Sequence, residues 1–174
     1  MTGTTHFLAG AAVGKLTKNP ILAIVIGFFI HFLMDMIPHW DLGYLFCSRW
    51  TCYVMAMSDP LFGILVFVII GLVMRFDKRT WMLTFLGGLA SLAPDAGSVL
   101  IKTFHIEQLR WFMEFHAMAH TLHKVRGDVF AWNEVSFTIR QMIIGLAVQV
   151  PFLAVSIWVL IKKFPVKNNN KKKK

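Results

Sequence analysis

Four long apolar stretches, separated by short polar segments, constrain this chain more than any other feature. They cover residues 20–38, 53–74, 81–101 and 141–161. Each approaches the roughly 20 apolar residues that a helix needs to cross a bilayer. Only 16% of the residues are charged and 56% are hydrophobic, whereas a soluble domain has about 25% charged residues. The sequence therefore predicts an all-α, polytopic membrane protein with about four transmembrane helices, a short N-terminal helix and an amphipathic helix rich in histidine.

The charge distribution predicts domain organisation and topology. Residues 1–165 are expected to form a single helical membrane domain, and residues 166–174 a basic, disordered tail. With four crossings, 12 of the 18 lysines and arginines lie on the side of both termini and 6 on the other. The positive-inside rule then predicts cytoplasmic termini in the plasma (inner) membrane. The expected partners are membrane lipid and, at the tail, anionic lipid, with no nucleic acid.

The first apolar residues are too few to cross a bilayer and predict a helical hairpin. Residues 4–16 would pack antiparallel to residues 20–38, with a turn between them. His6 lies 12 residues before the turn at Lys18, and His31 lies 13 residues after it. At about 1.5 Å per residue, both histidines reach a depth of roughly 18–20 Å from the turn. Gly10 and Gly14 form a pair of small residues that allows a neighbouring helix to come close.

His31 and Asp35 stand four positions apart in the second helix of this hairpin. That spacing puts both side chains on one helix face, about 5–6 Å apart. A neutral imidazole nitrogen and a carboxylate oxygen can bind one metal ion together, and both are ligands of zinc. Pro38 ends the predicted helix, so His39 and Asp41 just beyond it can fold back to the same site.

A second histidine pair lies on a predicted amphipathic helix over residues 104–125. His116 and His120 repeat the spacing of four residues, which is the ligand spacing of helical zinc sites. His105 and His123 fall on the same stripe by helical periodicity. We expect these two beside the metal ligands rather than among them.

Two further acidic residues are predicted on the same side of the membrane as the histidines. Asp95 follows Pro94 late in the third apolar stretch, and Asp59 lies near the start of the second. Ionisable residues within apolar stretches are costly in lipid and usually mark function. Asp59 alternatively fits a hydrogen bond between helices. Asp41 or Asp95 would act as a general base or orient a ligand histidine.

Taken together, these motifs resemble a known family, the bacterial and archaeal membrane-bound metal-dependent hydrolases. That family is itself similar to the zinc-dependent phospholipase C and single-strand nuclease superfamily. The resemblance covers roughly residues 4–125 and rests on Thr5-His6 with Gly10 and Gly14, His31-xxx-Asp35-xx-Pro38-His39, Leu92-Ala93-Pro94-Asp95 and the late helix rich in histidine.

The resemblance implies an all-helical fold with a zinc-type centre that hydrolyses a phosphoester-like bond. Carried over by position, it also implies a set of metal ligands, namely His6, His31, Asp35, Asp95, His116 and His120. The family commonly has Asp and His directly after the Pro-Asp motif, where this chain has Ala96, Gly97 and Ser98. That departure puts a second metal ion in doubt.

We therefore expect an integral-membrane, metal-dependent hydrolase that acts on a phosphoester of a lipid or lipid-linked substrate near the extracytoplasmic side. The expected ion is zinc, with manganese as the alternative, and Asp41 and Asp95 are the expected catalytic residues. The expected metal ligands are His6, His31, Asp35, His39, Asp95, His116 and His120.

Two other functions and one cysteine pair stay open on the sequence. A divalent-metal or proton-coupled transporter would need polar residues at successive depths through the bundle. A non-catalytic membrane scaffold would hold a structural metal in a closed site of four ligands. Cys47 and Cys52 are close enough in sequence for a disulfide bond or could remain free thiols.

Overall fold

The computed structural model of the chain describes residues 1–37, 49–121 and 139–163, and all their side chains except those of 49–53, 55, 56, 102, 120, 121, 139–142 and 144. Helices make up the secondary structure of these ranges, and no strand occurs in them. The all-α prediction is confirmed. The helices are α1 (Gly3–Leu16), α2 (Pro20–Asp35), α3 (Arg49–Val73), α4 (Lys78–Thr103), α5 (Arg110–Thr121) and α6 (Ile139–Ile161), with a 3-10 turn at Glu107–Leu109.

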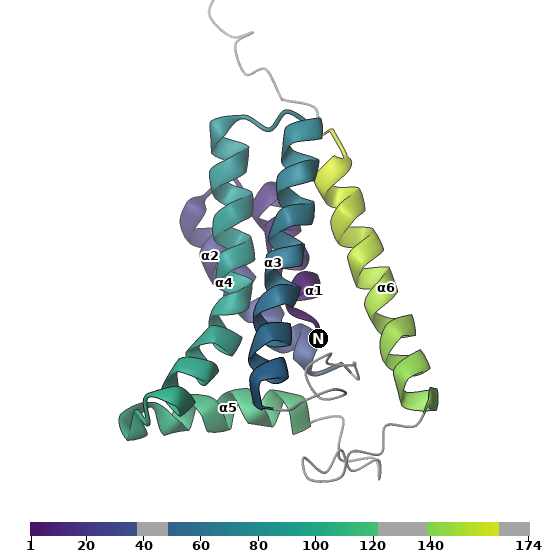
Figure 1. Ribbon diagram of the computed structural model, residues 1–174. Coiled ribbons are helices and arrows are strands. Elements are labelled where there is room, and N and C mark those ends of the chain that lie inside the picture. The colour runs from purple at the N-terminus through teal and green to yellow at the C-terminus, as the bar shows by residue number, and fades with distance from the viewer. Residues whose placement is uncertain (38–48, 122–138, 164–174) are drawn as a thin grey trace, which may run out of the picture.

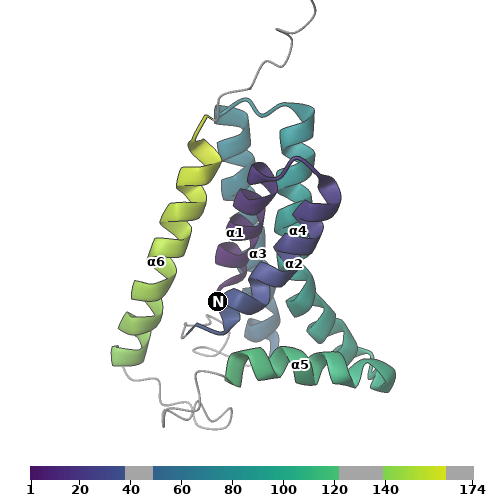
Figure 2. The same ribbon diagram turned by 180° about the vertical axis from the view of Figure 1, so that it is seen from behind.

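The short helix α1 lies in the middle of the bundle and packs against α2, α3, α4 and α6 (Figures 1 and 2). The helix can occupy this position because most of its own residues are apolar or small. Among them, Phe7, Leu8 and Ala11 are almost completely buried. Its first turn is capped by the side chain of Thr2, which accepts a hydrogen bond from the backbone N–H of Thr5.

Glycines allow α1 and α4 to approach until their backbones touch. A Cβ atom at Gly10 would collide with the carbonyl oxygen of Gly87, and one at Gly14 would collide with the carbonyl oxygen of Leu83. The small-residue pair predicted from the sequence therefore serves this contact, and its partner is α4. The close approach brings the polar side chains of α1 next to those of α2 and α4.

The predicted hairpin of α1 and α2 is confirmed. The chain turns within residues 17–19, and α2 begins with Pro20 after Asn19, whose side chain accepts a hydrogen bond from the backbone N–H of Ile21. This is the usual start of a helix, because proline needs no hydrogen-bond partner for its nitrogen at the first position. The hairpin places the ring of His6 4.2 Å from that of His31, measured between ring centroids.

The prediction of about four transmembrane helices is wrong. In the described part of the chain, only Lys78–Ile101 within α4 is long and apolar enough to cross a membrane. The helix α2 has 16 residues, and the described apolar parts of α3 and α6, Met57–Val73 and Gly145–Ile161, have at most 17. A crossing needs about 20 residues. The first predicted stretch also continued to Pro38, whereas α2 ends at Asp35.

The predicted helix over residues 104–125 is interrupted. The helix α4 continues to Thr103, and the chain then turns at His105, which has a left-handed φ of 51°. Only from Arg110 does α5 begin, and it lies across one end of the bundle (Figure 1). His105 is exposed at this corner, so its predicted place on the stripe of His116 is wrong. Helical spacing across residue 105 does not apply, because the helix is broken there.

Candidate metal centre

Four side chains from three helices bring their donor atoms within 4.8 Å of one another: His31, Asp35, Asp95 and His116. Asp35 Oδ2 lies 2.9 Å from His31 Nε2 and 3.3 Å from His116 Nε2. Asp95 Oδ1 lies 3.7 Å and 3.4 Å from the same two nitrogens, which are themselves 3.0 Å apart. This cluster could hold a metal ion.

The orientation of His31 follows from the sequence around it. His31 and Asp35 stand one turn apart on the face of α2 that packs against α1 and α4, and both are fully buried. The Nδ1 atom of His31 donates a hydrogen bond of 2.8 Å to the carbonyl oxygen of Ser91. Pro94, three residues later in the same helix, has no N–H for the carbonyl of Ala90, which precedes Ser91. With its proton on Nδ1, the ring directs the lone pair of Nε2 at the cluster.

His116 is oriented in a similar way by a side chain from α4. Its Nδ1 atom is hydrogen-bonded to Ser98 Oγ at 2.7 Å, so its Nε2 atom faces Asp35 and Asp95. Ser98 stands three positions after Asp95 and therefore on the same face of α4. A partner on the second ring nitrogen is the usual way in which proteins orient a histidine ligand.

His6 adds a third imidazole beside the cluster. Its ring is fully buried and stacked on His31 at an interplanar angle of 29°. Its Nε2 atom lies 3.0 Å from Asp35 Oδ1, yet neither ring nitrogen is aligned for a hydrogen bond in the described structure. The amino group of Met1 lies 2.9 Å from the same oxygen.

Burial lowers the pKa of His6 from 6.5 to about 4, with a smaller contribution from the nearby amino group of Met1. The ring is therefore neutral at pH 7. A buried ring nitrogen without a hydrogen bond is costly, and a neutral imidazole is the form that binds metals. The neutral ring of His6, with Nε2 3.0 Å from Asp35 Oδ1, thus fits a metal ion next to Asp35.

Among the four side chains of the cluster, that of Asp95 alone is substantially exposed. The side chains of His31 and Asp35 are fully buried and that of His116 is 8% exposed, whereas that of Asp95 is 44% exposed. A ligand or substrate can therefore approach past Asp95, close to where α5 crosses the end of α4. Catalytic metal sites keep such an open position, and structural sites usually do not.

Some predicted site residues cannot be placed. His39, Asp41, Cys47 and His123 lie outside the described residues. His120 belongs to α5 and Cys52 to α3, but neither side chain is among those described.

Asp59 does not join the cluster and has the alternative role that the sequence allowed. Its carboxylate accepts hydrogen bonds from the backbone N–H groups of Gly3 and Thr4 and from the Thr4 hydroxyl group. It therefore connects α3 to the N-terminal turn of α1, where the helix dipole favours a negative charge.

Two groups of the centre were not predicted from the sequence: the hydroxyl group of Ser98 and the backbone carbonyl of Ser91. The spacing between Asp95 and Ser98 was a readable signal, because residues three apart share a helix face. Nothing in the sequence identifies which backbone carbonyl a histidine will contact.

Comparison with known proteins adds no relatives. The chain matches no family model, no curated protein and no solved structure.

Proposed function

We propose that the chain is a metal-dependent hydrolase that contacts membrane lipid and cleaves a phosphoester of a lipid or lipid-linked substrate. The observation that carries the proposal is the cluster of imidazoles and carboxylates, in which Asp95 alone has a substantially exposed side chain. The resemblance of the sequence motifs to membrane-bound metal-dependent hydrolases points in the same direction.

The donor set favours zinc as the resident ion. Imidazole nitrogen and carboxylate oxygen bind zinc at about 2.0–2.2 Å, so two such ligands of a tetrahedral ion lie about 3.3–3.6 Å apart. Five of the six pairs of donor atoms in the cluster are separated by 2.9–3.7 Å, and all four atoms lie within 4.8 Å of one another. Manganese accepts the same atoms, and the metal analysis described below distinguishes the two.

In the proposed reaction, Asp95 is the group that meets the substrate. A bound zinc ion supplies Lewis-acid catalysis and lowers the pKa of a water molecule to about 7. The Asp95 carboxylate takes a proton from the attacking water, whose oxygen forms the new bond to phosphorus. The phosphorus–oxygen bond to the leaving alcohol breaks, and the alcohol oxygen receives the proton that Asp95 took from the water. His31 and Asp35 keep the other wall of the centre free of water because they are fully buried.

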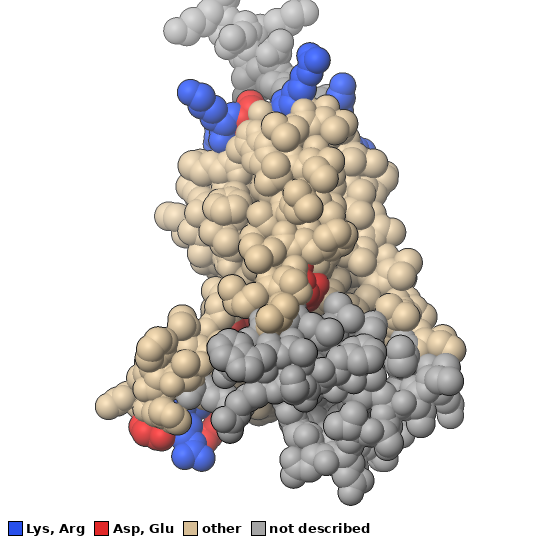
Figure 3. All heavy atoms as spheres, viewed as in Figure 1, with Lys and Arg blue, Asp and Glu red and all other residues tan. Residues whose placement is uncertain are grey.

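Lipid contact is proposed because Figure 3 shows few charged side chains on the visible face between the ends of the bundle, and many large apolar side chains of the described helices are exposed. Soluble monomers rarely expose apolar patches larger than a few hundred Å². Lys78–Ile101 in α4 is the one described segment long and apolar enough to cross a membrane. Its basic start favours the cytoplasmic leaflet, which would put the metal centre, at the other end of α4, on the extracytoplasmic side. Examples of exposed side chains on this surface are Phe29 and Leu33 on α2, Leu61 and Phe62 on α3, Phe85 and Leu89 on α4, and Val150 and Val155 on α6.

The two alternative functions are less well supported. A transporter needs a polar path beyond the centre, but the core there contains Phe7, Leu8, Phe67 and Leu160. A scaffold with a structural metal needs a closed site, and Asp95 leaves this one open.

The test is phosphodiesterase activity of the purified, zinc-loaded chain on a chromogenic phosphodiester and on a short-chain phospholipid. We expect hydrolysis of both, and a fall in kcat of at least about 100-fold for Asp95→Asn, because that amide cannot accept the proton. The matched control is Glu107→Gln, an exposed carboxylate near the same end of the bundle, which should leave kcat unchanged.

Three outcomes are informative. Equal activity of the parent and Asp95→Asn would remove Asp95 from the reaction. A parent that holds metal but hydrolyses neither substrate would contradict the hydrolase and favour the scaffold. Metal-dependent uptake into sealed vesicles by that same inactive parent would favour the transporter.

A further inference from the structure

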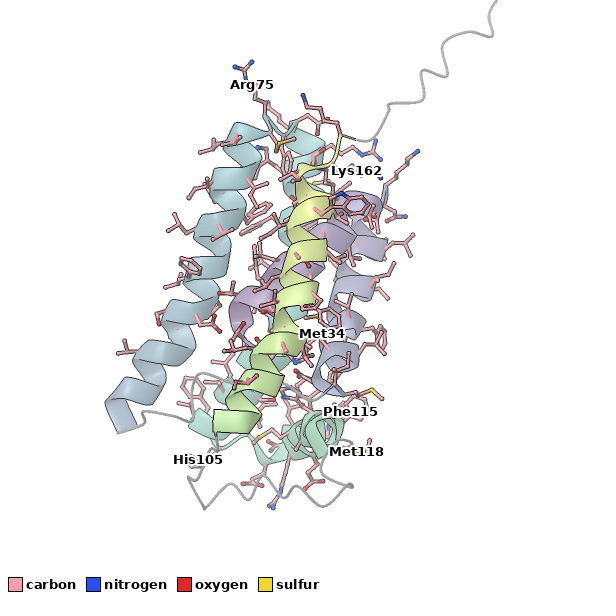
Figure 4. All side chains as sticks on the ribbon, turned by 90° about the vertical axis from the view of Figure 1, so that its right-hand side faces the viewer. Met34, Arg75, His105, Phe115, Met118 and Lys162 are labelled. Atoms are coloured by element: carbon pink, nitrogen blue, oxygen red, sulfur yellow. The ribbon has the colours of Figure 1, made fainter. Side chains whose placement is uncertain are left out.

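The end of the bundle opposite the metal centre is strongly basic. Figure 4 shows Arg75 and Lys162 at this end and His105, Phe115 and Met118 at the other. Asp77 is the only acidic residue at the basic end within the described ranges. The basic residues there are Lys15, Lys18, Arg75, Lys78, Arg79, Lys162 and Lys163.

A shallow surface cavity of about 400 Å³, largely open to solvent, lies at this basic end, between the end of α1, the turn from α3 to α4 and the end of α6. Its lining contains one acidic side chain against several cations, with Phe76 and Met74 as apolar wall. The polar residues of the lining are Lys15, Arg75, Asp77, Thr80, Lys162 and Lys163.

Lys15 is held in place at one wall of this cavity. Its ammonium group donates hydrogen bonds to the carbonyl oxygens of Leu160 and Lys162, the latter at 3.0 Å, and lies 4.9 Å from the ring centroid of Phe76. These carbonyls belong to the C-terminal end of α6, which the helix dipole makes attractive to cations. Partial burial lowers the pKa of Lys15. These contacts of Lys15 therefore connect the ends of α1 and α6 at this wall of the cavity.

Asp77 supplies the one negative charge in the lining of this cavity, and its carboxylate also caps a helix. Its Oδ1 atom accepts a 2.6 Å hydrogen bond from the backbone N–H of Thr80 and caps α4. This hydrogen bond holds the pKa of Asp77 below its usual value. Arg75, with a left-handed φ of 52° and an exposed side chain, stands at the rim.

We propose that this cavity binds the phosphate headgroup of an anionic phospholipid. An arginine fork and several ammonium groups are the side chains that recognise phosphate oxygens, and basic pockets between helices at the cytoplasmic side of a membrane bind lipid headgroups. The cavity lies where the basic end meets the apolar outer surface, so a headgroup in it leaves its acyl chains against α3 and α6. The inference rests on the lipid contact of the proposed function and is independent of the metal centre.

The test compares binding of phosphatidylglycerol and phosphatidylcholine to the full chain in detergent. We expect the double variant Arg75→Gln/Lys163→Gln to bind phosphatidylglycerol about 25-fold more weakly, because each cation near an anionic lipid surface contributes about fivefold, or about 1 kcal/mol. The loss should shrink as salt is added. The matched control, Arg110→Gln, removes an exposed cation from the other end of the bundle and should leave binding unchanged.

A second variant should strengthen binding rather than weaken it. Asp77→Asn removes the negative charge from the cavity but preserves the helix cap, because asparagine is also a strong N-cap residue. We expect it to bind phosphatidylglycerol about fivefold more tightly. A gain of affinity cannot come from partial unfolding, so this variant protects the test from a loss of stability.

Three results would overturn the inference: equal affinity of the parent and the double variant, equal affinity for the two lipids, or displacement of phosphatidylglycerol by inorganic phosphate at similar concentration. The last would identify a site for free phosphate. Metal content, measured on the same samples, tests the metal centre separately, so a failure of the lipid site can be distinguished from a failure of the proposed hydrolase. Failure of the parent to enter lipid vesicles would contradict the shared premise of lipid contact.

Discussion

The end of the bundle beside α5 and the end beside the turn from α3 to α4 both carry ionisable groups, but these groups point in opposite directions. At the first end, His6, His31 and Asp35 are fully buried and converge. At the second, Arg75 and Lys163 are exposed. Buried ionisable groups are tolerated only when they are paired, hydrogen-bonded or bound to a metal. The buried groups at the first end are therefore suited to bind a cation, and the exposed basic groups at the second end to bind an anion.

The helix α1 takes part in both ends. It supplies His6 to the metal centre and Lys15 to the basic cavity. It reaches both because its glycines let it lie against the backbone of α4. The difference between the two ends thus depends on one short helix held in a fixed position.

The largest expected effect comes from Gly10→Ala, which moves α1 away from α4. Its new Cβ atom would collide with the carbonyl oxygen of Gly87, a backbone atom that cannot turn aside. We expect the free energy of unfolding to fall by about 3 kcal/mol, and zinc binding to weaken because His6 is displaced. Denaturant unfolding in detergent measures the first effect, and zinc titration measures the second.

The matched control for this substitution is Gly97→Ala. A Cβ atom there meets ring carbons of the Phe112 side chain at 3.3 and 3.9 Å and no backbone atom, so a change below about 1 kcal/mol is expected. Equal destabilisation by both variants would mean that the contact of α1 with α4 has no special role.

An intermediate effect is expected from Ser98→Ala, which removes the hydroxyl group that orients His116. Loss of a group that supports a ligand histidine typically lowers metal affinity by about 10- to 100-fold. Competition with a zinc chelator measures this affinity. Ser156→Ala is the control, because its hydroxyl group is bonded to the carbonyl of Phe152 in α6. If both variants bind zinc like the parent, Ser98 does not act through His116.

The smallest effect on stability is expected at the basic end. Arg79→Gln removes an exposed hydrogen bond to the carbonyl oxygen of Lys18. We expect the free energy of unfolding to change by less than about 0.5 kcal/mol, with zinc affinity unchanged. Thermal unfolding with and without zinc checks both values. A large loss of stability here would contradict the view that the outward charges serve binding rather than folding.

Local helical geometry was readable from the sequence, and interruptions of that geometry were not. The proximity of His6 and His31 was predicted by counting residues on either side of one turn. The shared helix face of His31 and Asp35 was predicted from their spacing of four residues. The position of His105 did not, because the chain leaves the helix there through a left-handed residue. Such a break depends on how α4 and α5 pack and leaves no period in the sequence.

The prediction of about four transmembrane helices was wrong for a related reason. Apolar content was counted across helix ends, such as that of α2 at Asp35, which the packing of the bundle decides. The meeting of Asp95 with His116 depends on where α5 crosses the end of α4. The sequence indicated the residue types of the centre but not which of the acidic residues would reach it, and Asp59 caps α1 instead.

The most direct test of the metal centre is the metal content of the full chain purified in detergent, measured beside the double variant His31→Ala/Asp35→Ala. We expect about one zinc ion per chain in the parent, since three donors, from His31, Asp35 and His116, and a water molecule complete one tetrahedral catalytic site, and almost none in the variant. A parent that holds no zinc or manganese, even after incubation with either ion and gel filtration, would contradict the metal centre. The buried histidines and aspartates would then form a hydrogen-bonded polar network without a metal.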